Sequence, residues 1–203
     1  MLVLDHLAVS AATLGEGADR VGERLGVALE GGGKHAEMGT HNRLLSLGDL
    51  YLEVIAVDPA APRPGWPRWF DLDSFEGEPR LTNWVARCDD LEAELAVSPA
   101  GTGEPMALVR GEYRWRMAVP GDGVLPFGGA FPALISWEGT AHPAMALTGR
   151  GVRLRRLEIG HPEAGALQAA LAGRLDDPRV VVVPAAEKSL HAEFDTPLGV
   201  RQL

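Results

Sequence analysis

The chain has 203 residues, with 28 acidic against 19 basic side chains, a formal net charge of −9 and a pI of about 5.1. Hydrophobic residues make up 46% and charged residues 23%, the balance of a soluble globular protein. The acidic excess argues against non-specific nucleic-acid binding, which needs a basic surface, and no apolar run is long enough to span a bilayer. The single cysteine, Cys88, and an N-terminus without a signal-peptide pattern lead us to expect a cytoplasmic protein.

The first predicted unit covers residues 1–58 and has the order strand, helix and three strands. Thr13 and Glu16 form a capping box for the helix, and Gly26 is a typical C-terminal stop. A Gly48-Asp49 pair between two apolar segments is typical of a β-hairpin turn. The strands are expected at residues 2–9, 27–29, 43–47 and 50–57, with a glycine run at 31–33 after the second.

The same order restarts at Leu81, after a proline-rich connector at residues 59–80. Residues 81–149 are predicted to be the second module, and residues 150–203 a C-terminal strand-helix-strand unit that resembles a third, partial module. A four-stranded module cannot bury both faces of its sheet alone, so we expect the modules to pair within one compact domain. Trp66, Trp69 and Phe70 are expected to pin the connector to the body.

Two polar residues lie in strands that are predicted to be buried. His6 is expected to point to the same side as Leu4 and Ala8, and Glu53 lies in an otherwise apolar segment. A buried carboxylate is costly unless it is paired, hydrogen-bonded or bound to a cation. A structural interpretation stays open, with His6 as a core histidine and Glu53 as the partner of Arg43. If the two strands are neighbours, His6 and Glu53 can instead converge on Zn, Fe(II), Mn or Ni.

Candidates for a third metal ligand lie outside these strands. His35 and His41 flank a Gly39-Thr40 turn, and His142 precedes a proline. The alternative is that the two flanking histidines are solvated loop residues. The aromatic residues can either line an apolar groove or pack in the core; they are Trp66, Trp69, Phe70, Trp84, Trp115, Phe127, Phe131 and Trp137.

Three segments carry a resemblance to a known family. Asp5-His6-Leu7, Gly39-Thr40-His41-Asn42 and Tyr51-Leu52-Glu53-Val54-Ile55 resemble the glyoxalase-like domain family of the vicinal oxygen chelate superfamily, and Pro132 to Trp137 with His142-Pro143 resembles its second half. The resemblance implies an α+β fold, in which βαβββ modules pair into an open, barrel-like curved sheet with helices outside. It also implies metal ligands on the first and last strands of each module, where His6 and Glu53 match one module. The second module departs from the pattern, because Asn83 stands in place of the histidine and no acid stands near residues 134–136.

On this resemblance we expect a metal-dependent lyase or isomerase that holds a small oxygen-rich metabolite between the modules, with Glu53 as the catalytic residue. The expected ligands of a divalent metal (Zn, Ni, Mn or Fe) are His6, Glu53, His35 and His41. The expected substrate contacts are Asn42, Asn83, Trp84, Trp137 and His142. Two alternatives remain, a metal-free small-molecule binding or sequestering protein of the bleomycin-resistance type and an extradiol-type dioxygenase. We also expect a homodimer that binds neither nucleic acid nor membrane.

Overall fold

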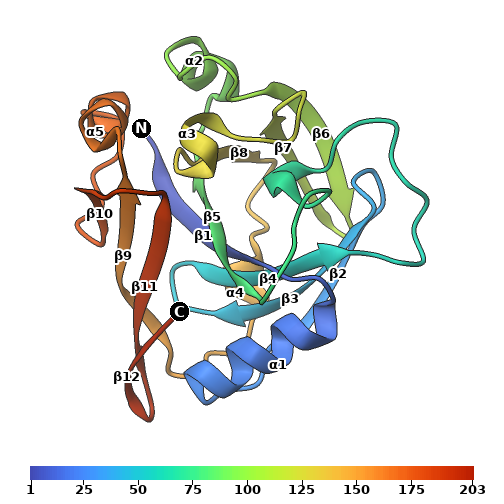
Figure 1. The fold of residues 1–203 in the computed structure, drawn as a ribbon. Coiled ribbons are helices and arrows are strands. Elements are labelled where there is room, and N and C mark those ends of the chain that lie inside the picture. The colour runs from blue at the N-terminus through green and yellow to red at the C-terminus, as the bar shows by residue number, and fades with distance from the viewer.

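The computed structural model describes all residues, 1–203. Eight strands form one curled sheet in the order β2-β3-β4-β1-β5-β8-β7-β6 (Figure 1). These strands are β1 (Val3–Ser10), β2 (Glu30–His35), β3 (Thr40–Ser46), β4 (Tyr51–Val57), β5 (Arg80–Arg87), β6 (Glu104–Arg110), β7 (Tyr113–Val119) and β8 (Ala133–Trp137). Helices α1 (Leu14–Leu25) and α2 (Leu91–Ala96) follow the first strand of each half. The expected α+β fold with two paired βαβββ modules is therefore confirmed.

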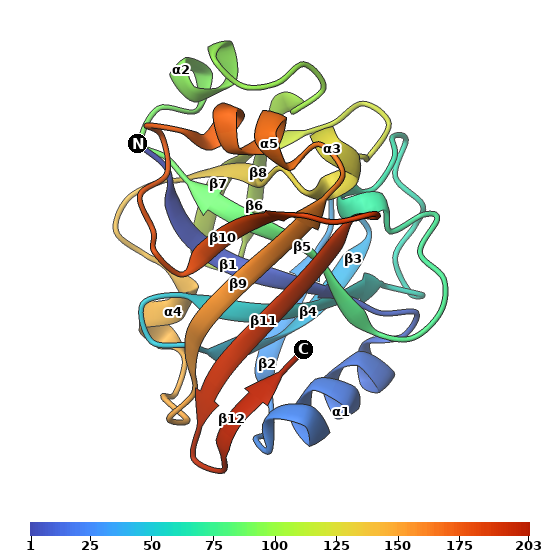
Figure 2. The same ribbon diagram turned by 60° about the vertical axis from the view of Figure 1, so that its left-hand side comes forward.

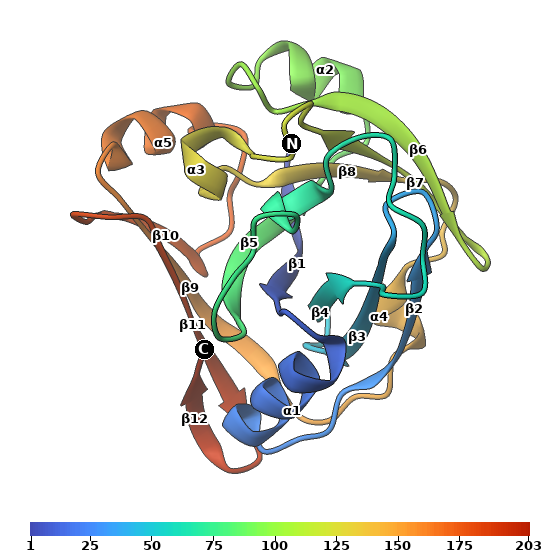
Figure 3. The same cartoon turned by 45° about the vertical axis from the view of Figure 1, so that its right-hand side comes forward.

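The two modules join through their first strands, because β1 pairs with β5 in antiparallel fashion. Each first strand also pairs in parallel with the last strand of its own module, β4 or β8. The free edges, β2 and β6, curl round toward each other (Figure 3). There Arg110 at the end of β6 donates to Nε2 of His35 at the end of β2, at 3.1 Å. The curled sheet therefore has an enclosed inner face and an outer face.

Helix α1 begins and ends where the sequence predicts. The side chain of Thr13 accepts the backbone N–H of Glu16 at 3.3 Å, and Gly26 ends the helix with φ 70°. A Cβ at Gly17 would lie 2.5 Å from a methyl carbon of Val54, so glycine at this position lets the helix lie close against β4.

The C-terminal segment forms a second sheet that covers the outer face of the first (Figure 2). Its elements are β9 (Arg153–His161), α5 (Ala164–Leu171), β10 (Val180–Pro184), β11 (Ser189–Thr196) and β12 (Gly199–Gln202), and the strand order is β10-β9-β11-β12. The chain order matches that of a module, but β9 lies between β10 and β11, whereas β1 lies beside the last strand of its own module. The strand pairing of this unit therefore differs from that of the two βαβββ modules.

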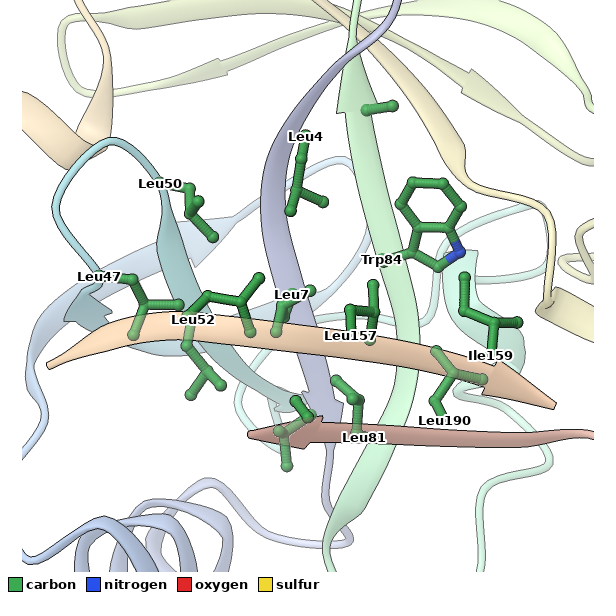
Figure 4. Close-up of a cluster of buried hydrophobic side chains, with 14 of the residues drawn as sticks. Leu4, Leu7, Leu47, Leu50, Leu52, Leu81, Trp84, Leu157, Ile159 and Leu190 are labelled. Carbon is green, nitrogen blue, oxygen red and sulfur yellow. The ribbon is translucent and has the colours of Figure 1, made fainter. Parts of the chain in front are cut away.

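The main hydrophobic core lies between the two sheets (Figure 4). Leu7 and Leu52 from the curled sheet meet Leu157 and Ile159 from β9, and all four side chains are fully buried. Each such side chain contributes about 1.5–3 kcal/mol through removal of its surface from water. The C-terminal sheet is thus an integral part of the folded domain.

The proline-rich connector between β4 and β5 is ordered against the body. It contains one 3-10 turn, η1 (Trp69–Asp71), and Trp69 and Phe70 in this turn are buried as expected, although Trp66 is exposed. The buried Arg68 pairs with Asp73 at 2.5 Å. Two further short helices are α3 (Pro126–Gly129) and α4 (Pro143–Ala146), and no helix has the length and apolar character to cross a membrane.

Candidate functional site

The inner face of the curled sheet holds a small cavity of about 20 Å³, which is room for about one water molecule. Its polar lining consists of His6, His35, Tyr51, Glu53 and Arg110. Its aromatic lining consists of Trp69, Phe70, Trp115 and Trp137. The cavity therefore combines a buried carboxylate and two imidazoles with an apolar wall, which excludes bulk water from them.

A β-bulge in β1 places two successive side chains on the inner face. The register with β5 shifts between Leu4 and His6, so that Asp5 is the extra residue. Leu4 packs in the outer core, whereas Asp5 and His6 are hydrogen-bonded to each other on the inner side. The expectation that Leu4 and His6 share a face is therefore wrong, because the bulge interrupts the alternation of the strand.

Asp5 is the centre of a buried hydrogen-bond network. Its Oδ1 accepts Nδ1–H of His6 at 2.6 Å, and its Oδ2 accepts Nε2–H of His142 at 2.9 Å and Nε1–H of Trp137 at 3.0 Å. Burial alone would raise the pKa of Asp5, but the hydrogen bonds from His142 and His6 hold this pKa well below its usual range. Asp5 is therefore a carboxylate that fixes the orientation of the His6 ring.

The Nε2 atom of His6 faces Glu53, and it lies 3.6 Å from Oε2 of that carboxylate. The ring of Tyr51 stacks on His6, with centroids 4.4 Å apart and an interplanar angle of 13°. Because Nδ1 of His6 donates to Asp5, a neutral ring presents a lone pair at Nε2. Two acceptor atoms so close together are stabilised by a proton, a cation or a donor group placed between them. The geometry thus marks a position for a reacting group.

Glu53 is held in place by Asn42 on the neighbouring strand β3. The side-chain Nδ2–H of Asn42 donates to Oε1 of Glu53 at 2.5 Å, while its Oδ1 accepts the backbone N–H of Gly33 at 2.7 Å. A Cβ at Gly32 would lie 2.1 Å from Oδ1 of Asn42, so only glycine allows β2 to lie this close. Arg43 is not the partner of Glu53, because it follows Asn42 on β3 and is exposed on the opposite face.

His35 is buried on the same side and is neutral. Its Nε2 accepts from Arg110 at 3.1 Å, so Nδ1 carries the proton and donates to Oγ1 of Thr40 at 3.0 Å. Burial, followed by the positive charge of Arg110, lowers the pKa of His35 to about 3. The guanidinium of Arg110 thus occupies the lone pair that His35 would offer to a metal ion.

The side chains of the cavity provide two of the ligands that a divalent metal ion needs, but not a third. Two ligands bound at 2.0–2.2 Å to one tetrahedral ion are roughly 3.4 Å apart, which is close to the separation between Nε2 of His6 and Oε2 of Glu53. No group of three His, Cys, Asp or Glu side chains surrounds a common point. A third ligand from His35 would require Arg110 to move away first.

The structure places three of the other sequence-predicted site residues away from this cavity. His41 lies on the outer side of β3 beside Lys34 and Arg43, because it alternates with the inward Asn42. Asn83 lines a separate, larger cleft, and its side chain donates to the backbone oxygen of Gly129 at 3.5 Å. Trp84 is a core residue, fully buried between the two sheets. The cavity region thus brings together His6, His35, Asn42, Glu53, Trp137 and His142.

Asp5, Tyr51 and Arg110 belong to the site but are absent from the site residues predicted from the sequence. Asp5 carries a signal, since a charged residue directly before His6 in an apolar strand requires a buried partner. No sequence signal marks Arg110 as a site residue, because only the closure of the sheet edges brings it to His35.

Comparison with known proteins gives one family and several similar folds. The sequence matches the family model of the glyoxalase-like domain over residues 4–175. No curated protein matches it significantly.

Among solved structures, a hypothetical protein from Staphylococcus aureus superposes with a TM-score of 0.59 and 14% identity, covering 93% of this chain and 88% of that chain. The methylmalonyl-CoA epimerase from Mycobacterium tuberculosis gives a TM-score of 0.44 and 19% identity over 70% of this chain and 90% of that chain. At these identities the likeness concerns the fold alone.

Proposed function

Because this chain belongs to the glyoxalase-like domain family, we propose that it is a lyase or isomerase that moves a proton on a small oxygen-rich metabolite. The observation that carries the proposal is the approach of Nε2 of His6 to Oε2 of Glu53, 3.6 Å apart on the wall of a buried cavity. Each of these two groups is oriented by a partner on its far side, Asp5 or Asn42.

In this proposal Glu53 is the general base. Asn42 occupies Oε1, so Oε2 is the oxygen that faces the cavity and can take a proton from a carbon next to a carbonyl group and return it to the neighbouring carbon. The lone pair at Nε2 of His6 takes the proton of the substrate hydroxyl group and returns it to the former carbonyl oxygen, and the carboxylate of Asp5 stabilises the imidazolium that forms in between. The aromatic wall excludes water, and this strengthens the electrostatic interactions of these charged groups with the substrate.

We also propose that a divalent metal ion binds at the same two side chains. His6 and Glu53 are the side chains that would hold Zn, Ni, Mn or Fe, and such an ion would polarise a carbonyl oxygen of the substrate. The test is metal analysis of protein purified without added metal, alongside His6→Ala and Glu53→Gln. We expect any bound metal to fall below stoichiometric amounts in both variants. Equal metal content in the wild type and both variants would contradict a site at His6 and Glu53.

The proton chemistry is tested by solvent isotope exchange. The protein is incubated in D₂O with hydroxyacetone, lactaldehyde and dihydroxyacetone, and deuterium at the carbon beside the carbonyl is measured by NMR. We expect Glu53→Gln to slow the exchange at least about a hundredfold, the usual contribution of a general base. The matched control is Glu37→Gln, which removes an exposed carboxylate and should leave the rate unchanged.

The proposal fails if Glu53→Gln exchanges deuterium as fast as the wild type. Binding of these compounds with no exchange above the solvent background would favour the sequestering role instead. The homodimer and the cytoplasmic location remain predictions from the sequence.

A further inference from the structure

A second cleft of the protein is separate from the Glu53 cavity. It has a volume of about 610 Å³, and its lining includes residues of helix α1 and of the strands β5 and β11. Clefts of this size typically hold a small organic molecule. Neither His6 nor Glu53 lines it.

The charged lining of this cleft is mostly positive. It consists of Arg20, Arg24, Arg80, Lys188 and Asp71. Arg20 pairs with Glu78 at 3.0 Å, but Arg24, Arg80 and Lys188 form no ion pair. In a chain of net charge −9, the gathering of unpaired cations in one cleft points to an anionic ligand.

Two of these cations are held in defined positions. The Nζ of Lys188 donates to the backbone oxygen of Thr82 at 3.0 Å, and the Arg80 guanidinium donates to the backbone oxygen of Glu76 at 2.8 Å. The guanidinium carbon of Arg80 also lies 4.4 Å from the centre of the Phe75 ring. Enclosure in the cleft and then the charge of Arg80 lower the pKa of Lys188 to about 8, and the charge of Asp71 only partly opposes this shift. These bonds leave further N–H groups of both side chains free for an anion.

Part of the remaining wall of the cleft is apolar and includes Phe70, Phe75, Val124 and Leu125. Phe70 also lines the Glu53 cavity, so its side chain borders both spaces. Its backbone has φ 58°, a left-handed conformation that is a genuine outlier for a bulky residue and that often marks a functional position. A molecule bound in the cleft would thus contact both cationic groups and aromatic carbon, which lie side by side where the Arg80 guanidinium covers the Phe75 ring.

We propose that this cleft binds an organic anion, a molecule with a flat apolar body and a carboxylate or phosphate group. The anionic group lies against Lys188, Arg80 and Arg24, and the body packs against Phe75 and Leu125. This site does not depend on the chemistry proposed for Glu53.

The test is calorimetric titration with phenyl phosphate and with benzoate, with benzyl alcohol as the neutral counterpart. We expect saturable binding of at least one anion and none of the alcohol, and the two anions distinguish a phosphate site from a carboxylate site. Lys188→Gln and Arg80→Gln should each weaken binding about tenfold, since each removes a charged donor, and Lys188→Arg should restore most of it. Arg114→Gln, at an exposed arginine on β7, is the matched control and should bind as the wild type does.

Glu53→Gln should leave this binding unchanged, so a failure here and a failure of the proposed proton chemistry are distinguishable. The proposal is overturned if neither anion binds saturably up to about 10 mM, a concentration that would detect even a weak site. It is also overturned if both charge-removing variants bind as tightly as the wild type while their melting temperatures match it.

Discussion

The neutral state of His35 predicts a specific loss of stability in mild acid. The pKa of this buried imidazole is about 3 in the folded protein, against an ordinary value of 6.5. As the pH falls below 6.5, His35 binds a proton in the unfolded chain but stays neutral in the folded protein. The free energy of unfolding therefore decreases with falling pH. The decrease continues until the pH reaches the folded value near 3.

The size of this loss of stability follows from the lowered pKa of His35. One pKa unit corresponds to 1.36 kcal/mol, so the 1.5 units between pH 6.5 and pH 5 predict a loss of about 2 kcal/mol from His35 alone. The assay is urea unfolding, followed by tryptophan fluorescence at several pH values between 7 and 5. His35→Gln lacks the titrating ring and should show a pH dependence that is flatter by about 2 kcal/mol, although it is less stable at pH 7. The exposed His191→Gln is the matched control and should follow the wild type. Parallel pH profiles for the wild type and His35→Gln would refute the reasoning.

Three further predictions concern stability and are measured by the same urea unfolding. Asp5→Asn should lower the free energy of unfolding by about 3 kcal/mol, because an amide has one acceptor oxygen and cannot accept from all three donors that surround Asp5; a loss below about 1 kcal/mol would contradict the network. Gly32→Ala should cost about 1–3 kcal/mol through overlap with Asn42, and an unchanged midpoint would show that β2 can move away. Leu157→Ala should cost about 2–5 kcal/mol while the exposed Leu198→Ala costs little; equal losses would contradict the core between the two sheets.

Local signals in the sequence were sufficient for the order strand, helix and three strands in the first module, but not for all the strand bounds. The cap at Thr13 and the stop at Gly26 fix helix α1 because they satisfy its free backbone groups. The turn at Gly48 and Asp49 fixes the β3–β4 hairpin, where Gly48 has φ 97°. The strand predicted at residues 27–29 instead runs from 30 to 35 and includes the glycine run, because the close approach to Asn42 selects glycine there over a good strand former.

The direction of a side chain in the site was predictable where alternation along a strand holds. Glu53 points inward as expected, since β4 has regular register with both neighbours. Asn83 was aligned with His6 by a shift in sequence, but the register shifts in the β1–β5 pair break this equivalence. His41 was treated as a loop residue, whereas β3 begins at Thr40 and directs His41 outward. The contact of Arg110 with His35 depends on sheet closure, which no local pattern encodes.

The central claim is that Asp5 holds His6 by its Nδ1–H, so that Nε2 faces Glu53. The most direct measurement is the ¹H–¹⁵N correlation spectrum of the imidazole rings, with His6 assigned from His6→Gln. We predict a protected, downfield Nδ1 proton on His6 that disappears in Asp5→Asn and persists in Glu53→Gln. A His6 ring that carries its proton on Nε2, or that is unaffected by Asp5→Asn, would contradict the account.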